Sequence, residues 1–138
     1  MAQYLFVYGT LRRDLVGEIS PELCSLMKGL QFISDGVIEG QLFDLGEFPA
    51  AIVGANFTSK IRGEIYEMPN PQAVFAVLDE YECFIPGELE ASMFARTLEH
   101  ITLPDQRQLS CWLYVYNDWV LNGKLIEQGD YVAYLKTR

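Results

Sequence analysis

The chain has 138 residues, of which 50% are hydrophobic, and a formal net charge of −9. This length suits one well-filled core and is too short for two ordinary domains, so we expect a single domain over residues 1–138. The basic residues are few and scattered, which argues against a nucleic-acid partner. We also expect a cytoplasmic protein with no membrane partner, because the sequence shows neither a secretion signal nor an apolar run near the roughly 20 residues of a membrane span.

The cysteine and histidine content indicates neither a disulfide framework nor a metal site. Cys24, Cys83 and Cys111 are odd in number and widely spaced, so we expect free thiols. The single histidine, His100, falls within a predicted strand and is interpreted as a solvated residue. No set of carboxylates has the spacing of a calcium loop. These residues therefore predict no metal site.

The first predicted element is a strand over residues 3–8 that breaks at Gly9 and Thr10. Backbone N–H groups beyond such a strand have no ladder partner, and they can converge on a carboxylate, a phosphate or an oxyanion. The segment is therefore a candidate anion site. The alternative is a buried strand at which Gly9 only makes a turn, and a motif this short does not choose between the two.

A short helix and a long β segment follow. Residues 21–29 are predicted to be a helix, with a serine as N-cap, a proline at its first position and a glycine at its end. Residues 30–45 have a β pattern that is interrupted by Gly36 and Gly40, which indicates bulges or a strongly bent strand. Bent strands are typical of a small barrel.

The middle of the chain predicts two strands and a second helix. Pro49 favours an edge position for the short apolar piece that contains it. Residues 60–68 alternate between polar and apolar side chains, as in a strand with one buried face. Asn70 and Pro71 then supply a cap and a first-turn proline for a helix that reaches Glu82.

Glu82 carries the sharpest chemical signal in the sequence. At about 100° per residue, the apolar side chains of its helix share one face, and Glu82 falls inside their arc while Glu80 points away. Low-polarity surroundings and the negative end of the helix dipole favour a raised pKa, which suits a general acid or base near neutral pH. The alternative is a helix that frays before Glu82 and leaves a solvated carboxylate. Asp79, at the edge of the arc, is interpreted as a solvated residue.

The last part of the chain predicts an antiparallel strand pair over residues 92–103 and 108–117. Residues 124–135 are expected to dock a short terminal segment against the body. These aromatic residues share one face of the second strand and form either core or the wall of a substrate pocket: Trp112, Tyr114 and Tyr116.

Four motifs occur in a characteristic order along the chain. They are residues 7–12 (VYGTLR), 40–50 (GQLFDLGEFPA), 61–66 (IRGEIY) and 78–82 (LDEYE). Together they make the chain resemble the γ-glutamylcyclotransferase-like family, which includes γ-glutamylcyclotransferases and γ-glutamylamine cyclotransferases. The resemblance covers most of the chain, and residues 124–131 look like those of the small bacterial members.

The resemblance implies an α+β fold, a small mixed β-barrel with flanking short helices, in which the loop after the first strand faces Glu82. It implies an enzyme that releases 5-oxoproline and a free amine from a γ-glutamyl amine or amino acid, without metal or cofactor. The substrate's α-amine attacks its own γ-carbonyl, and Glu82 serves as general acid and base. The substrate-binding residues that the resemblance implies are Tyr8, Gly9, Thr10, Leu11 and Tyr114.

The chain departs from the family pattern at two positions. Phe94 stands where some cyclotransferases have a tyrosine, and Cys83 replaces the usual small residue after the glutamate. An alternative function is a non-catalytic module that binds a small carboxylate-bearing amino-acid derivative, although a binder of anions gains nothing from Glu82. A further alternative is amide hydrolysis by a water that Glu82 activates. The amine leaving group and the oligomeric state are left open.

Overall fold

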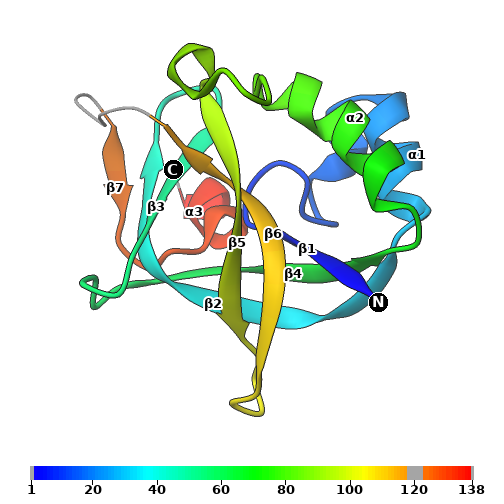
Figure 1. Cartoon of the computed structure of the whole chain (residues 1–138). Coiled ribbons are helices and arrows are strands. Elements are labelled where there is room, and N and C mark those ends of the chain that lie inside the picture. Colours follow the sequence, from blue (N-terminus) through cyan, green and yellow to red (C-terminus); the bar gives the residue numbers. More distant parts are fainter. Residues whose placement is uncertain (1, 118–122, 138) are drawn as a thin grey trace.

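Five strands close into a barrel in the computed structural model, which describes residues 2–117 and 123–137 (Figure 1). In order around the barrel they are β2 (Gln31–Asp44), β4 (Lys60–Met68), β1 (Gln3–Val7), β6 (Gln108–Tyr116) and β5 (Phe94–Thr102). The pairing of Val37 with Thr102 joins β5 back to β2 and closes the ring. The pairings are antiparallel except that of β1 with β6, so the sheet is mixed.

Further strands and short helices flank the barrel within the described ranges. Strands β3 (Pro49–Val53) and β7 (Lys124–Ile126) both pair with the second half of β2. The α-helices are α1 (Pro21–Lys28), α2 (Pro71–Tyr81) and α3 (Tyr131–Thr137), and two short 3₁₀ helices are Val16–Glu18 and Leu89–Ala91. The expected α+β barrel with flanking short helices is confirmed. No described helix has both the length and the apolar character needed to cross a membrane.

Both predicted helix starts are confirmed by their caps. The Ser20 hydroxyl accepts a hydrogen bond from the N–H of Leu23 at 3.1 Å, and Pro21 occupies the first helical position. Asn70 caps α2 in the same way, and Pro71 follows it. These residues satisfy N–H groups that the first turn of a helix leaves unpaired.

Strand β2 bends strongly because its two halves pair with different partners. The first half pairs with β4, and the second half pairs with β3 on one side and β7 on the other. The register shifts between Phe32 and Ser34, so the bulge does not lie at Gly36 or Gly40 as the glycines had suggested. Those glycines serve close packing: a Cβ atom at Gly40 would lie 2.4 Å from a backbone oxygen of β3. The position of Pro49 on the edge strand β3 is confirmed.

Strand β1 is buried on both faces, which explains its continuous apolar sequence. Leu5 and Val7 belong to a core cluster shared with α1 and α2. Phe6 and Tyr8 belong to a second cluster, inside the barrel, that also includes Tyr131 of α3. In Figure 1, α1 and α2 lie together at one side of the barrel and α3 lies apart from them. The predicted docking of residues 124–135 against the body is confirmed, since Tyr131 belongs to this second cluster.

Candidate active site

A cavity of about 330 Å³ opens where the end of β1, the turn between β2 and β3, and the C-terminal end of α2 come together. Met93 and Phe94, at the start of β5, complete its wall. All six residues that the sequence singled out as site residues line it: Tyr8, Gly9, Thr10, Leu11, Glu82 and Tyr114. The fold therefore brings together the loop after the first strand and the glutamate at the end of the helix.

The loop after β1 presents backbone donors that lack partners. The N–H of Arg12 donates to the Gly9 carbonyl at 3.1 Å and makes a turn, while the N–H groups of Gly9, Thr10 and Leu11 donate to no other described residue. Gly9 does not have a positive φ. A side chain is excluded there because a Cβ atom would lie 2.7 Å from Cγ of Pro49. The turn and the edge strand β3 thus lie in direct contact.

A buried carboxylate on the neighbouring strand β4 binds the loop that follows β1. Glu64 on β4 has a side chain only 2% exposed, and it accepts hydrogen bonds from Arg12 Nε at 3.1 Å, the Arg13 N–H at 2.9 Å and the Tyr66 hydroxyl at 3.0 Å. Arg12 also binds Asp130 at 2.8 Å through Nη1. The sequence predicted only one buried face for β4. Glu64 lies on the other face and is buried because the loop covers it, which strand alternation could not reveal.

The end of α2 places Glu82 in a fixed backbone geometry. The N–H of Glu82 donates to the Leu78 carbonyl at 2.8 Å, so the helix does not fray before it. The N–H of Cys83 donates to the Glu80 carbonyl at 3.2 Å, and the N–H of Phe84 donates to the carbonyl five residues earlier at 2.8 Å. This pair of bonds is a Schellman motif, whose next-to-last position is left-handed. Cys83 occupies it with φ 56°, which explains why a small residue suits this position.

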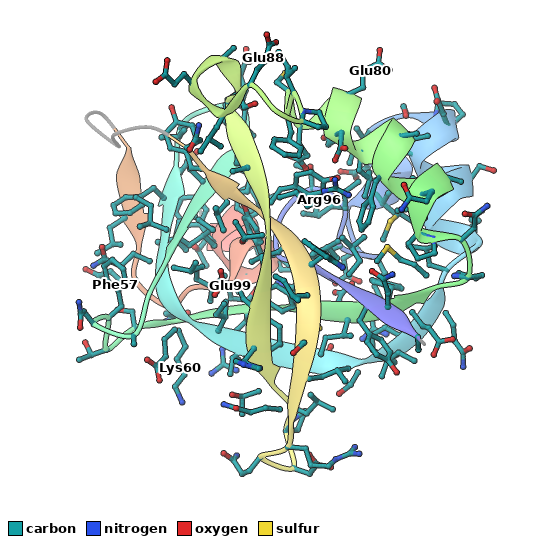
Figure 2. The ribbon with its side chains drawn as sticks, viewed as in Figure 1. Phe57, Lys60, Glu80, Glu88, Arg96 and Glu99 are labelled. Atoms are coloured by element: carbon teal, nitrogen blue, oxygen red, sulfur yellow. The ribbon has the colours of Figure 1, made fainter. Side chains whose placement is uncertain are left out.

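The Glu82 carboxylate lies in a weakly polar part of the cavity. It is partly buried, and burial raises its pKa to about 8. Within the described ranges the carboxylate forms no ion pair, and no lysine, arginine or histidine lines the cavity. Burial also raises the pKa of Tyr8, Tyr81 and Tyr114, and the nearby charge of Glu82 raises each further. Glu80, by contrast, points outward from α2 (Figure 2).

Asp79 is not the solvated residue that the sequence suggested. Its side chain is 14% exposed, and its Oδ1 accepts a hydrogen bond from the Tyr114 hydroxyl at 2.6 Å. Arg96 Nε lies 3.5 Å from the same oxygen. Arg96 comes from β5 and lies beneath α2 (Figure 2), with its guanidinium 3.8 Å from the ring centre of Phe75. The prediction is wrong because side chains from β5 and β6 reach the helix edge.

Two further hydrogen bonds tie the walls of the cavity together. The Tyr8 hydroxyl donates to the backbone carbonyl of Tyr114 at 2.6 Å, so this side chain is part of the framework. Thr10 Oγ1 and Tyr81 Oη lie 2.9 Å apart and join the loop to the helix end.

The predicted aromatic face of β6 has two roles. Tyr114 lines the cavity, whereas Trp112 packs against Phe75 and Tyr116 packs against Phe94. Only one of the three aromatic residues is therefore part of the pocket wall. Phe94 also lines the cavity, which leaves an apolar ring where some cyclotransferases have a tyrosine.

Comparisons with known proteins agree with this architecture. A family model described as "Gamma-glutamyl cyclotransferase, AIG2-like" matches residues 5–133. The γ-glutamylcyclotransferase family protein YtfP of Escherichia coli strain K12 is 33% identical over 129 residues, which cover 93% of this chain and 95% of that protein. The solution NMR structure of YtfP from Escherichia coli superposes with a TM-score of 0.65 at 30% identity, covering 96% of this chain and 98% of that chain.

A more distant relative has the same fold. The crystal structure of an AIG2-like protein from Mus musculus superposes with a TM-score of 0.66 at 22% identity, covering 94% of this chain and 88% of that chain. The match of the family model over nearly the whole chain and the identity to YtfP show the family, and the superposed structures share the fold. The chain belongs to the γ-glutamyl cyclotransferase, AIG2-like family.

Proposed function

We propose that this chain is a γ-glutamylcyclotransferase-like enzyme that releases 5-oxoproline and a free amine from a γ-glutamyl amine or amino acid. One observation supports the proposal most strongly. Glu82, partly buried and without an ionic partner among the described residues, lines the same cavity as the unpaired N–H groups of residues 9–11. A site with backbone donors for an anion and a carboxylate of raised pKa suits proton transfer beside a bound carboxylate.

The loop at residues 9–11 binds the glutamyl end of the substrate. Its N–H groups receive the α-carboxylate and the oxygen of the reacting carbonyl, where negative charge develops. Backbone donors have this task because no cation among the described residues lines the cavity. Tyr8 contributes through its backbone, since its hydroxyl is already bound to the carbonyl of Tyr114. Tyr114 contributes its side chain.

Glu82 moves the proton. Its carboxylate takes a proton from the α-amine of the substrate, the amine nitrogen bonds to the γ-carbonyl carbon, and a five-membered lactam forms. The bond from that carbon to the departing nitrogen then breaks, and Glu82 returns its proton to the departing amine. Nucleophile and electrophile belong to one molecule, so proximity supplies much of the acceleration. A pKa of about 8 suits a group that must both accept and donate a proton near neutral pH.

The test follows from which atom attacks. A γ-glutamyl amide with a free α-amine and its N-acetyl analogue are offered in water enriched in heavy oxygen, and the products are followed by mass. We expect unlabelled 5-oxoproline from the first compound and no product from the second, because acylation removes the nucleophile. Labelled glutamate, or cleavage of the acetylated compound, would identify a hydrolase. Binding of the amide without any product would identify the non-catalytic module instead.

A further inference from the structure

We infer that Asp79 is a positioning residue: it holds the hydroxyl proton of Tyr114 away from the cavity, so that the Tyr114 oxygen accepts a hydrogen bond from the substrate's α-amine. This inference rests on the proposed function for the identity of the ligand. It assigns a role to a carboxylate that lies outside the cavity and touches neither substrate nor Glu82. The orientation of one hydroxyl then decides whether the Tyr114 side chain donates to the cavity or accepts from it.

The direction of the hydrogen bond follows from simple chemistry. A phenol has one hydrogen, and an ionised carboxylate can only accept, so Tyr114 donates to Asp79 across 2.6 Å. This is a short, charge-assisted bond. Because its single hydroxyl hydrogen is donated to Asp79, Tyr114 has only oxygen lone pairs left for the cavity that it lines. Donation to a carboxylate also polarises the phenol and makes its oxygen a better acceptor.

The structure keeps Asp79 available for this bond. Arg96 Nε lies 3.5 Å from the Asp79 oxygen and offsets its charge, and both side chains are largely buried, at 19% and 14% exposed. Arg96 is itself fixed by cation–π contacts, 3.8 Å from the ring centre of Phe75 and 5.6 Å from that of Trp112. The chain of contacts therefore runs from an aromatic cluster through Arg96 and Asp79 to the hydroxyl of Tyr114.

Because the Tyr114 hydroxyl donates to Asp79, it does not donate to Glu82, and Glu82 remains a good proton acceptor. A donor aimed at the Glu82 carboxylate would stabilise its charge and make it a weaker base. No described residue supplies such a donor, and Tyr114 has no hydrogen left to give. The other titratable and charged groups around Glu82 and Tyr114 are these: Tyr8 just beyond β1, Glu47 of the β2–β3 turn, Tyr81 of α2, Cys83 beyond α2, and Asp79 and Arg96 outside the cavity.

The experiment reads the titration of Glu82 directly, without substrate. Protein labelled with carbon-13 at the glutamate carboxyl groups is titrated by NMR, and the Glu82 signal is assigned from its loss in Glu82→Gln. We expect Asp79→Ala to lower the pKa of Glu82 by about one unit or more, because the freed hydroxyl turns into the cavity and donates to the carboxylate. In a Tyr114→Phe background the same change should have a much smaller effect, since only the charge of Asp79 is removed.

Asp79→Asn is the conservative control. Its amide oxygen still accepts from Tyr114, so the pKa of Glu82 should move no further than in the Tyr114→Phe background. The pH profile of kcat/KM should follow: its acid limb moves to lower pH in Asp79→Ala and returns close to its place in Asp79→Asn.

Tyr114→Phe, which removes the acceptor, should raise KM for a γ-glutamyl amide roughly threefold to tenfold. Equal shifts of the Glu82 pKa with and without the Tyr114 hydroxyl overturn the inference.

A measurement on the wild-type protein covers the case in which Asp79→Ala fails to fold. The hydroxyl proton of Tyr114, identified by its absence in Tyr114→Phe, should show nuclear Overhauser contacts to the side-chain protons of Asp79. Contacts to Glu82 in their place would overturn the inference. The proposed function has a separate test, and it fails if the wild-type protein releases no 5-oxoproline. The titration of Glu82 uses no substrate, so its result does not depend on that outcome.

Discussion

Glu82 sits where its charge is unfavourable for folding. Its pKa rises from 4.5, the ordinary value, to about 8 in the folded protein because the carboxylate is removed from water. The folded protein therefore binds this proton more tightly than the unfolded chain does. The cavity that Glu82 lines is also lined by residues 9–11, whose N–H groups have no partner among the described residues. The property that suits proton transfer is thus the one that opposes stability.

Replacing Glu82 with glutamine tests its role in turnover. The change keeps the shape and removes proton transfer, so turnover should fall by roughly 10²-fold or more while ligand binding survives. The measurement is the rate of 5-oxoproline release. Glu80→Gln is the matched control, because its side chain points outward on the same helix (Figure 2), and it should leave the rate unchanged. A rate for Glu82→Gln close to wild type would contradict proton transfer by Glu82.

The pH dependence of stability tests the environment of Glu82 independently of activity. Between pH 4.5 and about 8 the folded state holds a proton that the unfolded state has lost, so the free energy of unfolding falls as pH rises through this window. Glu82→Gln has no carboxyl group at this position, so its free energy of unfolding does not fall for this reason. It should therefore be more stable than wild type above pH 8, by about 1 kcal/mol or more, and should gain little below pH 4.5. Chemical denaturation at pH 5 and pH 9 measures the difference, and a pH-independent gap would rule out this linkage.

At the scale of the element, the end of α2 is defined by a residue in an unfavourable backbone conformation. Cys83 has φ 56°, and a side chain there is crowded against the following carbonyl oxygen. The Schellman bonds to Asp79 and Glu80 nevertheless hold it there, because they satisfy carbonyl groups that would otherwise be unpaired. The motif fixes the direction in which the chain leaves Glu82.

Cys83→Gly should therefore stabilise the protein by about 1 kcal/mol, since glycine adopts this conformation without strain. Cys83→Val should destabilise it, because a β-branched side chain tolerates positive φ poorly. Melting temperatures of the two variants give the answer. Gln106→Gly is the matched control, since Gln106 has φ 74° in the β5–β6 turn and does not line the cavity. It should gain stability and leave turnover unaltered; a loss of stability in both glycine variants would contradict the assignment of strain.

At the scale of the whole molecule, two ion pairs of similar length differ in burial. Arg12 and Asp130 lie 2.8 Å apart and belong to the network around the buried Glu64. Arg107 and Asp105 lie 2.7 Å apart on the surface, in the β5–β6 turn. An exposed pair is screened by water and contributes little, whereas removing one member of a buried network leaves an uncompensated charge.

Glu64→Ala should accordingly lower the free energy of unfolding by roughly 3–5 kcal/mol, because Arg12 and the Tyr66 hydroxyl lose their buried acceptor. Asp105→Ala should leave the denaturation midpoint unchanged. Urea denaturation of both variants tests the contrast. If the two variants were destabilised equally, burial could not be the cause.

Local patterns predicted what depends on neighbours in the sequence. The caps at Ser20 and Asn70 and the apolar arc around Glu82 need only a few consecutive residues, and all appear in the fold. The placement of Asp79 and Glu64 depends on partners 35 and 52 residues away, Tyr114 and Arg12, so periodicity alone could not reveal it. The barrel and the cavity were predicted from the resemblance of four ordered motifs to a known family. No local sequence pattern determines which strands pair.

The pairing of β1 has a consequence for how the protein is made. This strand precedes both of its partners, β4 and β6, along the chain, and Arg12 just beyond it is held by Glu64 and Asp130. Until β4 and β6 have been synthesised, the apolar residues 5–7 therefore have no partner strand, and exposed hydrophobic strands of this kind are prone to aggregate. The turn after β1 gains its full set of contacts only after residue 130 has been synthesised.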